Sequence, residues 1–359
     1  MNTLEVLEKL SNAFGPPGGE DPTRDAIVEI LRGHVDEMRV DALGNLIALK
    51  RGTGRYPLKI MLAAHMDEVG LMIMGVESDG TLRFHVAGGI DDRVLLGKVV
   101  LVGPDRVPGV IGLKPIHLLR GNERTAVVKT DALRIDIGAE SKEAAGKQVQ
   151  PGQHAVFATQ FGPLGATAAA GEQAHTLVKG KALDDRAGCT VLVELLRGEP
   201  YPYDVYGVFT TQEEIGSRGA RVAAHAIQPQ AAFALEGTTA NDLPQEEGED
   251  VSPSTTLGHG PAITVMDRSL LADRRLNDHL IATAGELGIA YQFKQPGTGG
   301  TDAGSIHLVG AGIPSTVVSV PCRYIHSPVA ILDVDDLQNA VKLMRGALDR
   351  LTPDVLAQA

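Results

Sequence analysis

Apolar residues recur at helical spacing near both ends of the chain. Leu4, Leu7 and Leu10 predict a first helix, and the Asp-Pro pair at residues 21–22 is a typical start for a second helix, which we expect to end near Gly33. The same periodicity predicts later helices over residues 187–196, 274–287 and 335–351.

Short apolar runs between these helices predict β-strands. The run over residues 58–64 is almost wholly apolar, which is typical of a strand that helices cover on both faces. Further strands are expected over residues 45–49, 205–210, 231–235 and 315–320. Alternating strands and helices favour an α/β fold.

The segment from residue 69 to residue 167 lacks this alternation. Short apolar runs such as residues 70–76 are separated by turn-forming pairs such as Asp79-Gly80, which predicts a small β-rich domain. We therefore expect an α/β domain built from residues 1–68 and 168–359, interrupted by an insertion over residues 69–167.

Composition and charge narrow the possible functions. The chain has 359 residues, with 33 Lys and Arg against 45 Asp and Glu, which gives a formal net charge of −12. A field of that sign repels phosphate backbones and anionic lipids, so we expect neither a nucleic-acid partner nor a membrane partner. Hydrophobic residues make up 43% of the chain, which is enough for a buried core.

The start of the chain and its cysteines suggest a cytoplasmic protein. The first twenty residues lack the basic start and apolar centre of a signal peptide, and no run approaches the roughly 18 apolar residues of a membrane-spanning helix. Cys189 and Cys322 are too few for a disulfide framework, so we interpret both as small buried thiols in a reducing compartment.

Polar side chains that could bind a metal ion or take part in catalysis follow several predicted strands. His65 and Asp67 come directly after the apolar run 58–64, and residues i and i+2 at a strand end point to the same side. A metal-binding histidine commonly donates its second ring N–H to a carboxylate or carbonyl, and Asp67 could accept it. A solvated strand end is the simpler explanation of this pair taken alone.

Two pairs of adjacent carboxylates also stand at element boundaries. Asp184 and Asp185 precede a predicted helix, which one of them is expected to cap, leaving the other spare. Glu213 and Glu214 follow a predicted strand, where α/β folds place their sites; the alternative is a solvated turn. Adjacent carboxylates are poorly placed for a glycosidase, whose two carboxyls stand about 5–9 Å apart across the substrate.

Glu236 and His326 complete the set of candidates. Glu236 follows the run 231–235, and His326 comes a few residues after the strand predicted over 315–320. Two histidines and three carboxylates supply five ligands, with one carboxylate left over, which suits a two-metal hydrolytic site whose ions share one carboxylate. The six residues are His65, Asp184, Glu213, Glu214, Glu236 and His326.

Five motifs stand in order along the chain. They are His65-Met66-Asp67-Glu68-Val69-Gly70, Ala182-Leu183-Asp184-Asp185-Arg186-Ala187-Gly188, Glu213-Glu214-Ile215-Gly216, Gly300-Thr301-Asp302-Ala303 and Arg323-Tyr324-Ile325-His326-Ser327-Pro328. Together they resemble the motifs of the M42 metallo-aminopeptidases, the glutamyl, leucyl and lysyl aminopeptidases that include the tetrahedral TET enzymes. The resemblance implies a mixed central sheet flanked by helices, as in zinc exopeptidases, with an inserted PDZ-like dimerisation domain.

The resemblance also implies a ligand set. His65 and Glu236 would hold one metal ion, and Glu214 and His326 would hold the other. Asp184 would bridge the two ions. Members of the family carry either Asp or Glu where Glu236 stands. The longer Glu side chain should still bind the ion, but this position leaves the metal preference and the fine specificity open.

Supporting roles follow from the same resemblance. Glu213 would be the general base, and Asp67 would orient His65. Asp302 is a candidate supporting or pocket residue, although the glycines around it could simply form a turn. His117, inside the insertion, is expected to serve structure or assembly.

The resemblance predicts an aminopeptidase that removes N-terminal residues from short peptides with two divalent ions. Zinc is expected, with cobalt or manganese as alternatives. Six dimers would close into a hollow tetrahedral dodecamer. Two other functions remain open, namely another binuclear hydrolase such as a deacylase of N-acyl amino acids, and a non-catalytic assembly protein.

Overall fold

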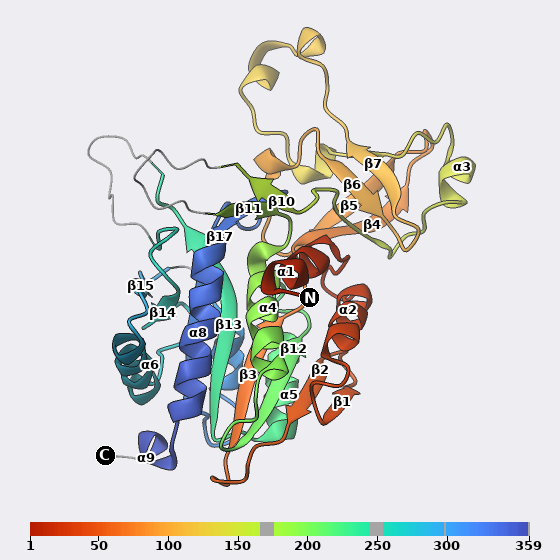
Figure 1. Cartoon of the computed structure of the whole chain (residues 1–359). Helices are drawn as coiled ribbons and strands as arrows, with labels where there is room; N and C mark the ends of the chain where they lie inside the picture. Colours follow the sequence, from red (N-terminus) through yellow and green to blue (C-terminus); the bar gives the residue numbers. More distant parts are fainter. Residues whose placement is uncertain (166–175, 244–253, 298, 358–359) are drawn as a thin grey trace.

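A large α/β domain carries a smaller β-barrel, which projects at the upper right of Figure 1. The structure is a computed structural model that describes residues 1–165, 176–243, 254–297 and 299–357. The large domain holds the N-terminal helices, the central sheet and the C-terminal helices, and the barrel interrupts it after the third strand.

A mixed sheet of eleven strands forms the centre of the large domain. In spatial order the main path is β1 (Glu37–Val40), β2 (Leu46–Lys50), β12 (Asp204–Thr210), β3 (Lys59–His65), β13 (Ala231–Ala240), β16 (Ser315–Arg323), β17 (Ala330–Asp333), β11 (Leu177–Gly180) and β10 (Gly162–Leu164). Beside it, β14 (Ala262–Thr264) pairs with β16 and β15 (Gln292–Lys294). The four central strands β12, β3, β13 and β16 are parallel, so their carboxyl ends meet at one edge.

Helices cover both faces of this sheet. One face carries α1 (Thr3–Asn12), α2 (Asp21–Leu31), α4 (Leu183–Arg197), α6 (Arg274–Leu287) and α8 (Val334–Arg350), and the short α9 (Pro353–Leu356) packs against α6. The other face carries α5 (Arg218–Ile227) and α7 (Asp302–Ile306). This layering explains why the central strands are largely apolar.

Strand β3 shows the layering residue by residue. Ile60, Leu62 and Ala64 pack into the core on the side of α4, whereas Met61 and Ala63 pack into the core on the side of α5. Successive side chains of a strand point to opposite faces, so a strand between two helical layers needs apolar residues at every position. The apolar run over residues 58–64 is therefore explained by the structure.

The inserted domain is a closed six-stranded barrel. Its strands are β4 (Gly70–Val76), β5 (Leu82–Ala87), β8 (Ile135–Asp136), β7 (Val107–Ile111), β6 (Val99–Val102) and β9 (His154–Phe157), with α3 (Lys142–Gly146) beside them. The short 3-10 helices η1 (Asp92–Val94) and η4 (Thr130–Ala132) flank the barrel. It has a core of its own, filled by residues such as Leu71, Ile73 and Phe84.

A long arm extends from the barrel at the top of Figure 1. It carries η2 (Ile116–Leu118) and η3 (Gly121–Arg124), and it includes the exposed His117. Leu113, Ile116 and Leu118 on this arm are 56%, 66% and 60% exposed.

The expected fold class, a mixed α/β sheet with an inserted β-rich domain, is confirmed. The barrel strands lie within the insertion expected over residues 69–167, but β10 in that same range pairs with β11 of the main sheet. Residue 167 lies outside the described residues, so the exact division into domains stays a prediction. In the part of the chain that the structure describes, no helix is long and apolar enough to cross a membrane.

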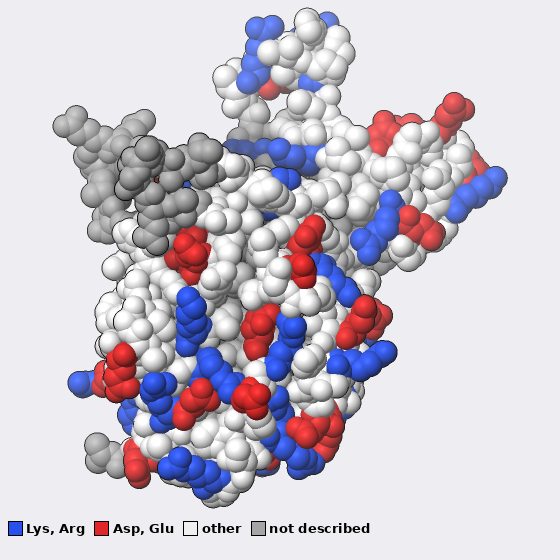
Figure 2. All heavy atoms as spheres, viewed as in Figure 1, with Lys and Arg blue, Asp and Glu red and all other residues white. Residues whose placement is uncertain are grey.

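Charged residues of both signs are interspersed on the face shown in Figure 2. Over the large domain, Lys and Arg alternate with Asp and Glu, and on this face no broad basic surface forms. This mixed charge on one face accompanies a formal net charge of −12 for the chain.

Candidate active site

Parallel strands bring the predicted site residues to one edge of the sheet. His65 ends β3 in register with Thr210, which ends β12, and Glu236 lies in the neighbouring β13 opposite Ser319 of β16. The carboxyl edge of such a sheet is where α/β folds bind ligands. A cavity of about 860 Å³ opens there. Its lining includes His65, Asp184, Glu213, Glu214, Glu236 and His326.

Two groups of possible metal ligands meet at Asp184. Nε2 of His65 lies 3.3 Å from Oδ1 of Asp184 and 3.6 Å from Oε2 of Glu236. Nε2 of His326 lies 3.5 Å from Oδ2 of Asp184 and 3.7 Å from Oε2 of Glu214. Asp184 therefore offers one oxygen to each group.

The spacing of these atoms suits metal ions better than hydrogen bonds. All four distances exceed the roughly 2.7–3.2 Å of ordinary hydrogen bonds. Donors that lie about 2.0–2.1 Å from a tetrahedral ion are themselves about 3.3–3.4 Å apart, because the edge of a tetrahedron is about 1.6 times the bond length. Imidazole and carboxylate are donors that divalent ions accept. Donor chemistry and spacing together fit two such ions.

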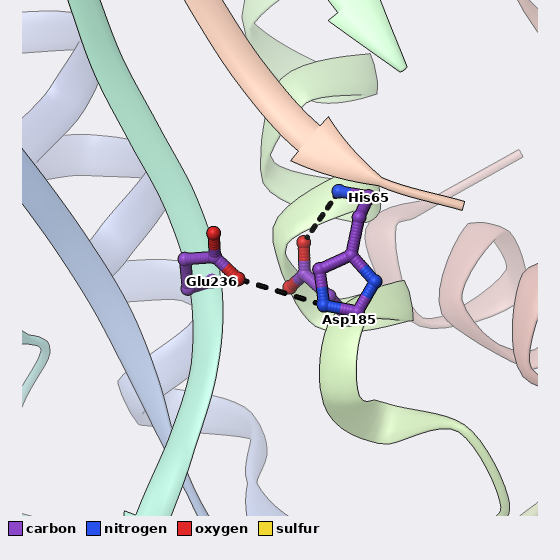
Figure 3. A group of neighbouring side chains, drawn as sticks. All are labelled: His65, Asp185 and Glu236. Atoms are coloured by element: carbon purple, nitrogen blue, oxygen red, sulfur yellow. Dashed lines mark hydrogen bonds and ion pairs between the residues drawn. The ribbon is translucent and has the colours of Figure 1, made fainter. Parts of the chain in front are cut away.

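Asp185 also lies near His65 and Glu236, as Figure 3 shows, with ligand atoms within 4.8 Å of one another. Its oxygens already have partners: Oδ2 accepts the backbone N–H of His65 at 3.0 Å, and Oδ1 accepts the N–H of Gly188 at 2.9 Å. Asp184 and Asp185 have non-helical dihedral angles, so the regular helix begins after them. Asp185 caps that helix, and Asp184 is left to face the cavity.

Gly188 allows the start of α4 to approach β13 closely. A Cβ atom at this position would lie 2.2 Å from the carbonyl oxygen of Leu235 and 2.4 Å from Oδ1 of Asp185. Glycine therefore holds the two aspartates beside the strand that carries Glu236.

Asp67 contacts both the histidine and the loop of the two glutamates. Nδ1 of His65 lies 3.0 Å from the backbone oxygen of Asp67 and 3.5 Å from its Oδ1, so the carbonyl is the closer partner of the ring. The carboxylate accepts the backbone N–H of Glu213 at 2.9 Å and that of Glu214 at 3.0 Å. Asp67 thus positions the glutamate loop as well as His65.

Comparisons with known proteins identify the family of the chain. Residues 44–343 match the M42 glutamyl aminopeptidase family. The chain is 34% identical to lysyl aminopeptidase of Pyrococcus furiosus, over 98% of this chain and 99% of that protein. It is 30% identical to glutamyl aminopeptidase of Lactococcus lactis, over 100% and 99% respectively. The chain belongs to the M42 aminopeptidase family.

Solved structures of similar proteins share the whole fold of this M42 aminopeptidase. An aminopeptidase from the archaeon Desulfurococcus kamchatkensis is 37% identical with a TM-score of 0.90, over 99% of this chain and 96% of that one. The TET1 peptidase of Pyrococcus horikoshii, which can assemble into a tetrahedron or a large octahedral shell, is 34% identical with a TM-score of 0.82, over 98% and 100%. Another similar structure, 35% identical with a TM-score of 0.84, is a dodecamer.

Glu213 lies beside the group formed by His65, Asp184 and Glu236. Its side chain is 15% exposed, and its Oε2 lies 4.0 Å from Nε2 of His65. Ser217 donates a hydrogen bond to its Oε1 at 3.0 Å. One oxygen is thus held by the chain and the other faces the site.

Glu20 supports the same loop, although no sequence motif marked it. This buried carboxylate accepts the backbone N–H of Gln212 at 3.1 Å, across 192 residues of chain. Together with the two bonds to Asp67, each N–H of residues 212–214 is directed at a buried carboxylate.

Crowding and burial shift the acidity of the site. Burial, together with Asp184 and Glu213, raises the pKa of Glu214 to about 8, although His326 opposes this. Burial lowers the pKa of His326, but Asp184 and Glu214 outweigh it and raise that pKa to about 10. Burial likewise raises the pKa of Glu236 well above its ordinary value. The cluster therefore binds protons that divalent cations can replace.

A buried ion cluster fixes the site loops against α1. Nζ of Lys181 lies 2.7 and 2.9 Å from the two carboxylate oxygens of Glu68, and Nη2 of Arg186 lies 3.3 Å from Oε1 of Glu68. Both cationic side chains also donate to carbonyl groups at the end of α1. Because Glu68 follows Asp67 and Arg186 follows Asp185, the cluster connects both site loops to the N-terminal segment.

Asp302 lies beneath the cavity and not in its lining. Its carboxylate accepts the hydroxyl of Thr210, and its backbone N–H faces Oε1 of Glu236 at 3.3 Å. These contacts favour the supporting role over the pocket role. Cys189 is fully buried, and burial raises the pKa of its thiol well above the ordinary value, as expected for a packing residue.

Proposed function

We propose that this aminopeptidase uses two divalent cations to remove N-terminal residues from short peptides. His65 and Glu236 would hold one ion, and Glu214 and His326 the other. The observation that carries the proposal is the position of Asp184, whose two oxygens lie 3.3 and 3.5 Å from the two histidines. One carboxylate between two such pairs is the arrangement of a two-metal hydrolase.

Glu213 is the proposed general base. When bound, divalent cations supply Lewis-acid polarisation of the scissile carbonyl and lower the pKa of water at the site. Glu213 takes a proton from the attacking water and returns it to the leaving amine. Its free oxygen faces the site, while the hydrogen bond from Ser217 and the bond from the backbone N–H of Glu213 to Asp67 hold the residue in place.

The size and the polar lining of the cavity suit a short peptide with a free amino group. A volume of about 860 Å³ accepts a few residues but not a folded chain. Carboxylate oxygens of the lining can accept hydrogen bonds from the amine of an unblocked N-terminus. This favours an aminopeptidase over a deacylase, whose substrates carry a blocked amine.

We also propose that the chains assemble, through dimers, into a dodecamer. The exposed apolar residues Leu113, Ile116 and Leu118 on the arm of the barrel support contact with a second copy. Assemblies of similar peptidases support the larger shell. Light scattering should give the mass of twelve chains, and a monomer mass would contradict this proposal.

The function is tested with paired peptides. Peptides that begin with Leu, Glu, Lys or Met are each compared with the N-acetylated twin, using chelated protein reloaded with zinc, cobalt or manganese. Release of the first residue from free-amine peptides only, and only with metal, is expected. Cleavage of the acetylated twins would favour the deacylase instead. No cleavage with any metal would favour an assembly protein without activity.

A further inference from the structure

Two cationic side chains, Arg268 and Lys294, line the same cavity as the candidate metal ligands. Among the described residues, neither side chain has a carboxylate within salt-bridge distance. Arg323, which precedes the cavity residue Tyr324, is by contrast paired, because its Nε lies 2.6 Å from Oδ1 of Asp242. Two cations in a concave wall that have no anionic partner in the described part of the chain can bind an anionic ligand.

A tight turn holds the backbone of Arg268 in place. Asp267, the buried residue before it, accepts the backbone N–H of Ser269 at 2.6 Å and that of Leu270 at 2.8 Å. These hydrogen bonds fix the backbone on both sides of Arg268.

This turn packs against the segment that supports Glu236. The N–H of Arg268 donates to the carbonyl of Gly299 at 3.1 Å. A Cβ atom at Gly304 would lie 2.1 Å from Oγ of Ser269, so only glycine permits this approach of the turn to α7. The N–H at the start of α7 in turn faces Glu236. The backbone of Arg268 is thus connected, through α7, to the candidate metal ligand Glu236.

Lys294 reaches the cavity from a different element. It is the last residue of β15, in register with Thr264 of β14, and the next residue donates its backbone N–H to Ser254. The two cations therefore come from separate segments and converge on one space.

The rest of the cavity wall offers little to an aliphatic side chain. Ile325 is the one aliphatic side chain among the described residues that line it. Several hydroxyl groups line it instead, from Thr238, Thr239, Ser254 and Thr301. A wall of hydroxyls and cations selects an anionic side chain over an apolar one.

We infer that Arg268 and Lys294 make the enzyme selective for peptides that begin with Glu or Asp. The inference rests on the proposed function and names its substrate class. Two bound divalent cations would balance the four carboxylates that line the cavity, so Arg268 and Lys294 would leave the described wall with a net positive charge. A guanidinium binds a carboxylate through two parallel hydrogen bonds, which favours Glu over its neutral isostere Gln.

The test compares aminoacyl p-nitroanilides of Glu, Asp, Gln, Leu and Lys with the metal-loaded enzyme. These substrates have no second residue and no terminal carboxylate, so a charge preference reports on the first side chain alone. kcat/KM for Glu should exceed that for Gln by about 10- to 100-fold, the range expected for hydrogen bonds to a charged group. The Glu preference should weaken as salt is added.

Variants assign the preference to these residues. Arg268→Gln should lower the Glu-to-Gln ratio about tenfold, Arg268→Lys should keep most of it, and Arg268→Glu should shift the preference towards Lys. Lys294→Gln should lower the same ratio. Arg274→Gln is the matched control, because this arginine on α6 is 90% exposed, makes only an i,i+4 ion pair, and does not line the cavity. It should leave the ratio unchanged.

The outcomes separate this inference from the proposed function. The inference would be overturned by a ratio of kcat/KM for Glu to that for Gln near one. It would also be overturned if Arg268→Gln and Lys294→Gln left this ratio unchanged. In either case, release of Leu or Lys would still support the aminopeptidase function. No release of any residue with zinc, cobalt or manganese would refute the function instead. In that case calorimetric binding of L-glutamate and L-glutamine to the metal-loaded protein still decides the inference, which requires tighter binding of glutamate.

Discussion

Replacing each of two adjacent glutamates by glutamine separates the proposed general base from a proposed metal ligand. Glu213→Gln keeps the oxygen that accepts the bond from Ser217, so the fold and the metal content should be retained. Glu214→Gln removes the carboxylate that faces Nε2 of His326 at 3.7 Å, so metal should be lost. The two variants have the same chemical change one residue apart.

The structure also sets the size of each effect. Asp67 holds the backbone N–H of both residues, so the loop should keep its position in both variants and the difference should come from the side chains. Loss of a positioned general base costs about 10² to 10⁴ in kcat. At about 1.36 kcal/mol for each factor of ten, this is about 3–5 kcal/mol of transition-state stabilisation.

The assay measures metal content and turnover on the same samples. Wild type and variants are chelated, reloaded with zinc, freed of excess ion and analysed for bound metal, and kcat is then measured on one peptide. Glu213→Gln should match wild type in metal content with the large loss of kcat, and Glu214→Gln should hold less metal and recover as zinc is added. A Glu213→Gln enzyme with full metal and kcat within about threefold of wild type would refute the assignment of the base.

Three further expectations concern stability. Lys181→Met leaves Glu68 with a weaker partner and should cost about 3–5 kcal/mol in urea unfolding; a near-native value would show that the ion cluster does not stabilise the fold. Gly188→Ala should destabilise the protein by about 1–3 kcal/mol or more, because its Cβ meets a carbonyl oxygen, and a native melting temperature would contradict this. Without metal, the melting temperature should fall as the pH rises from about 5 to about 9. Glu214 and His326 bind their protons more tightly in the folded chain (pKa about 8 and about 10) than at their ordinary values of 4.5 and 6.5. Their stabilising effect is therefore complete below the ordinary pKa and is lost as the pH rises through the folded pKa, so a melting temperature that rises over this range in chelator would be the contrary result.

The central strands of the fold were predictable because burial on both faces leaves a local signal. The run over residues 58–64 became β3, and the expected helices over 274–287 and 335–351 became α6 and α8 with shifts of a residue at most. These elements carry their own periodicity, so local sequence is sufficient to find them.

Some elements were missed, for different reasons. Helix α5 was missed although its buried residues Ala220, Ala223, Ala224 and Ile227 recur at helical spacing, and the parallel strands β12 and β13 on either side require a crossover between them. The short strands β14 and β15 exist because they extend the edge beside β16. Strand β10 lies within the range expected for the insertion, yet it belongs to the main sheet. Its place is set by pairing with β11, which local composition does not reveal.

The site was predictable as far as its residues follow strand ends. The six candidate residues line one cavity because the carboxyl ends of parallel strands meet, and the resemblance of the five motifs to the M42 family suggested their grouping. Glu20 and Lys181 could not be found in that way, because each acts across the fold on a loop distant in sequence. The placement of Arg268 depends on a tertiary turn and its packing against α7, for which the sequence has no local signal.

Anomalous diffraction from crystals grown with zinc tests the central claim most directly. Two peaks about 3.5–4 Å apart are expected, the usual separation in two-metal sites. One should lie beside His65 and Glu236, the other beside Glu214 and His326, with the carboxylate of Asp184 between them. A single peak, or two peaks bridged by Asp185 in place of Asp184, would contradict the proposed binuclear centre.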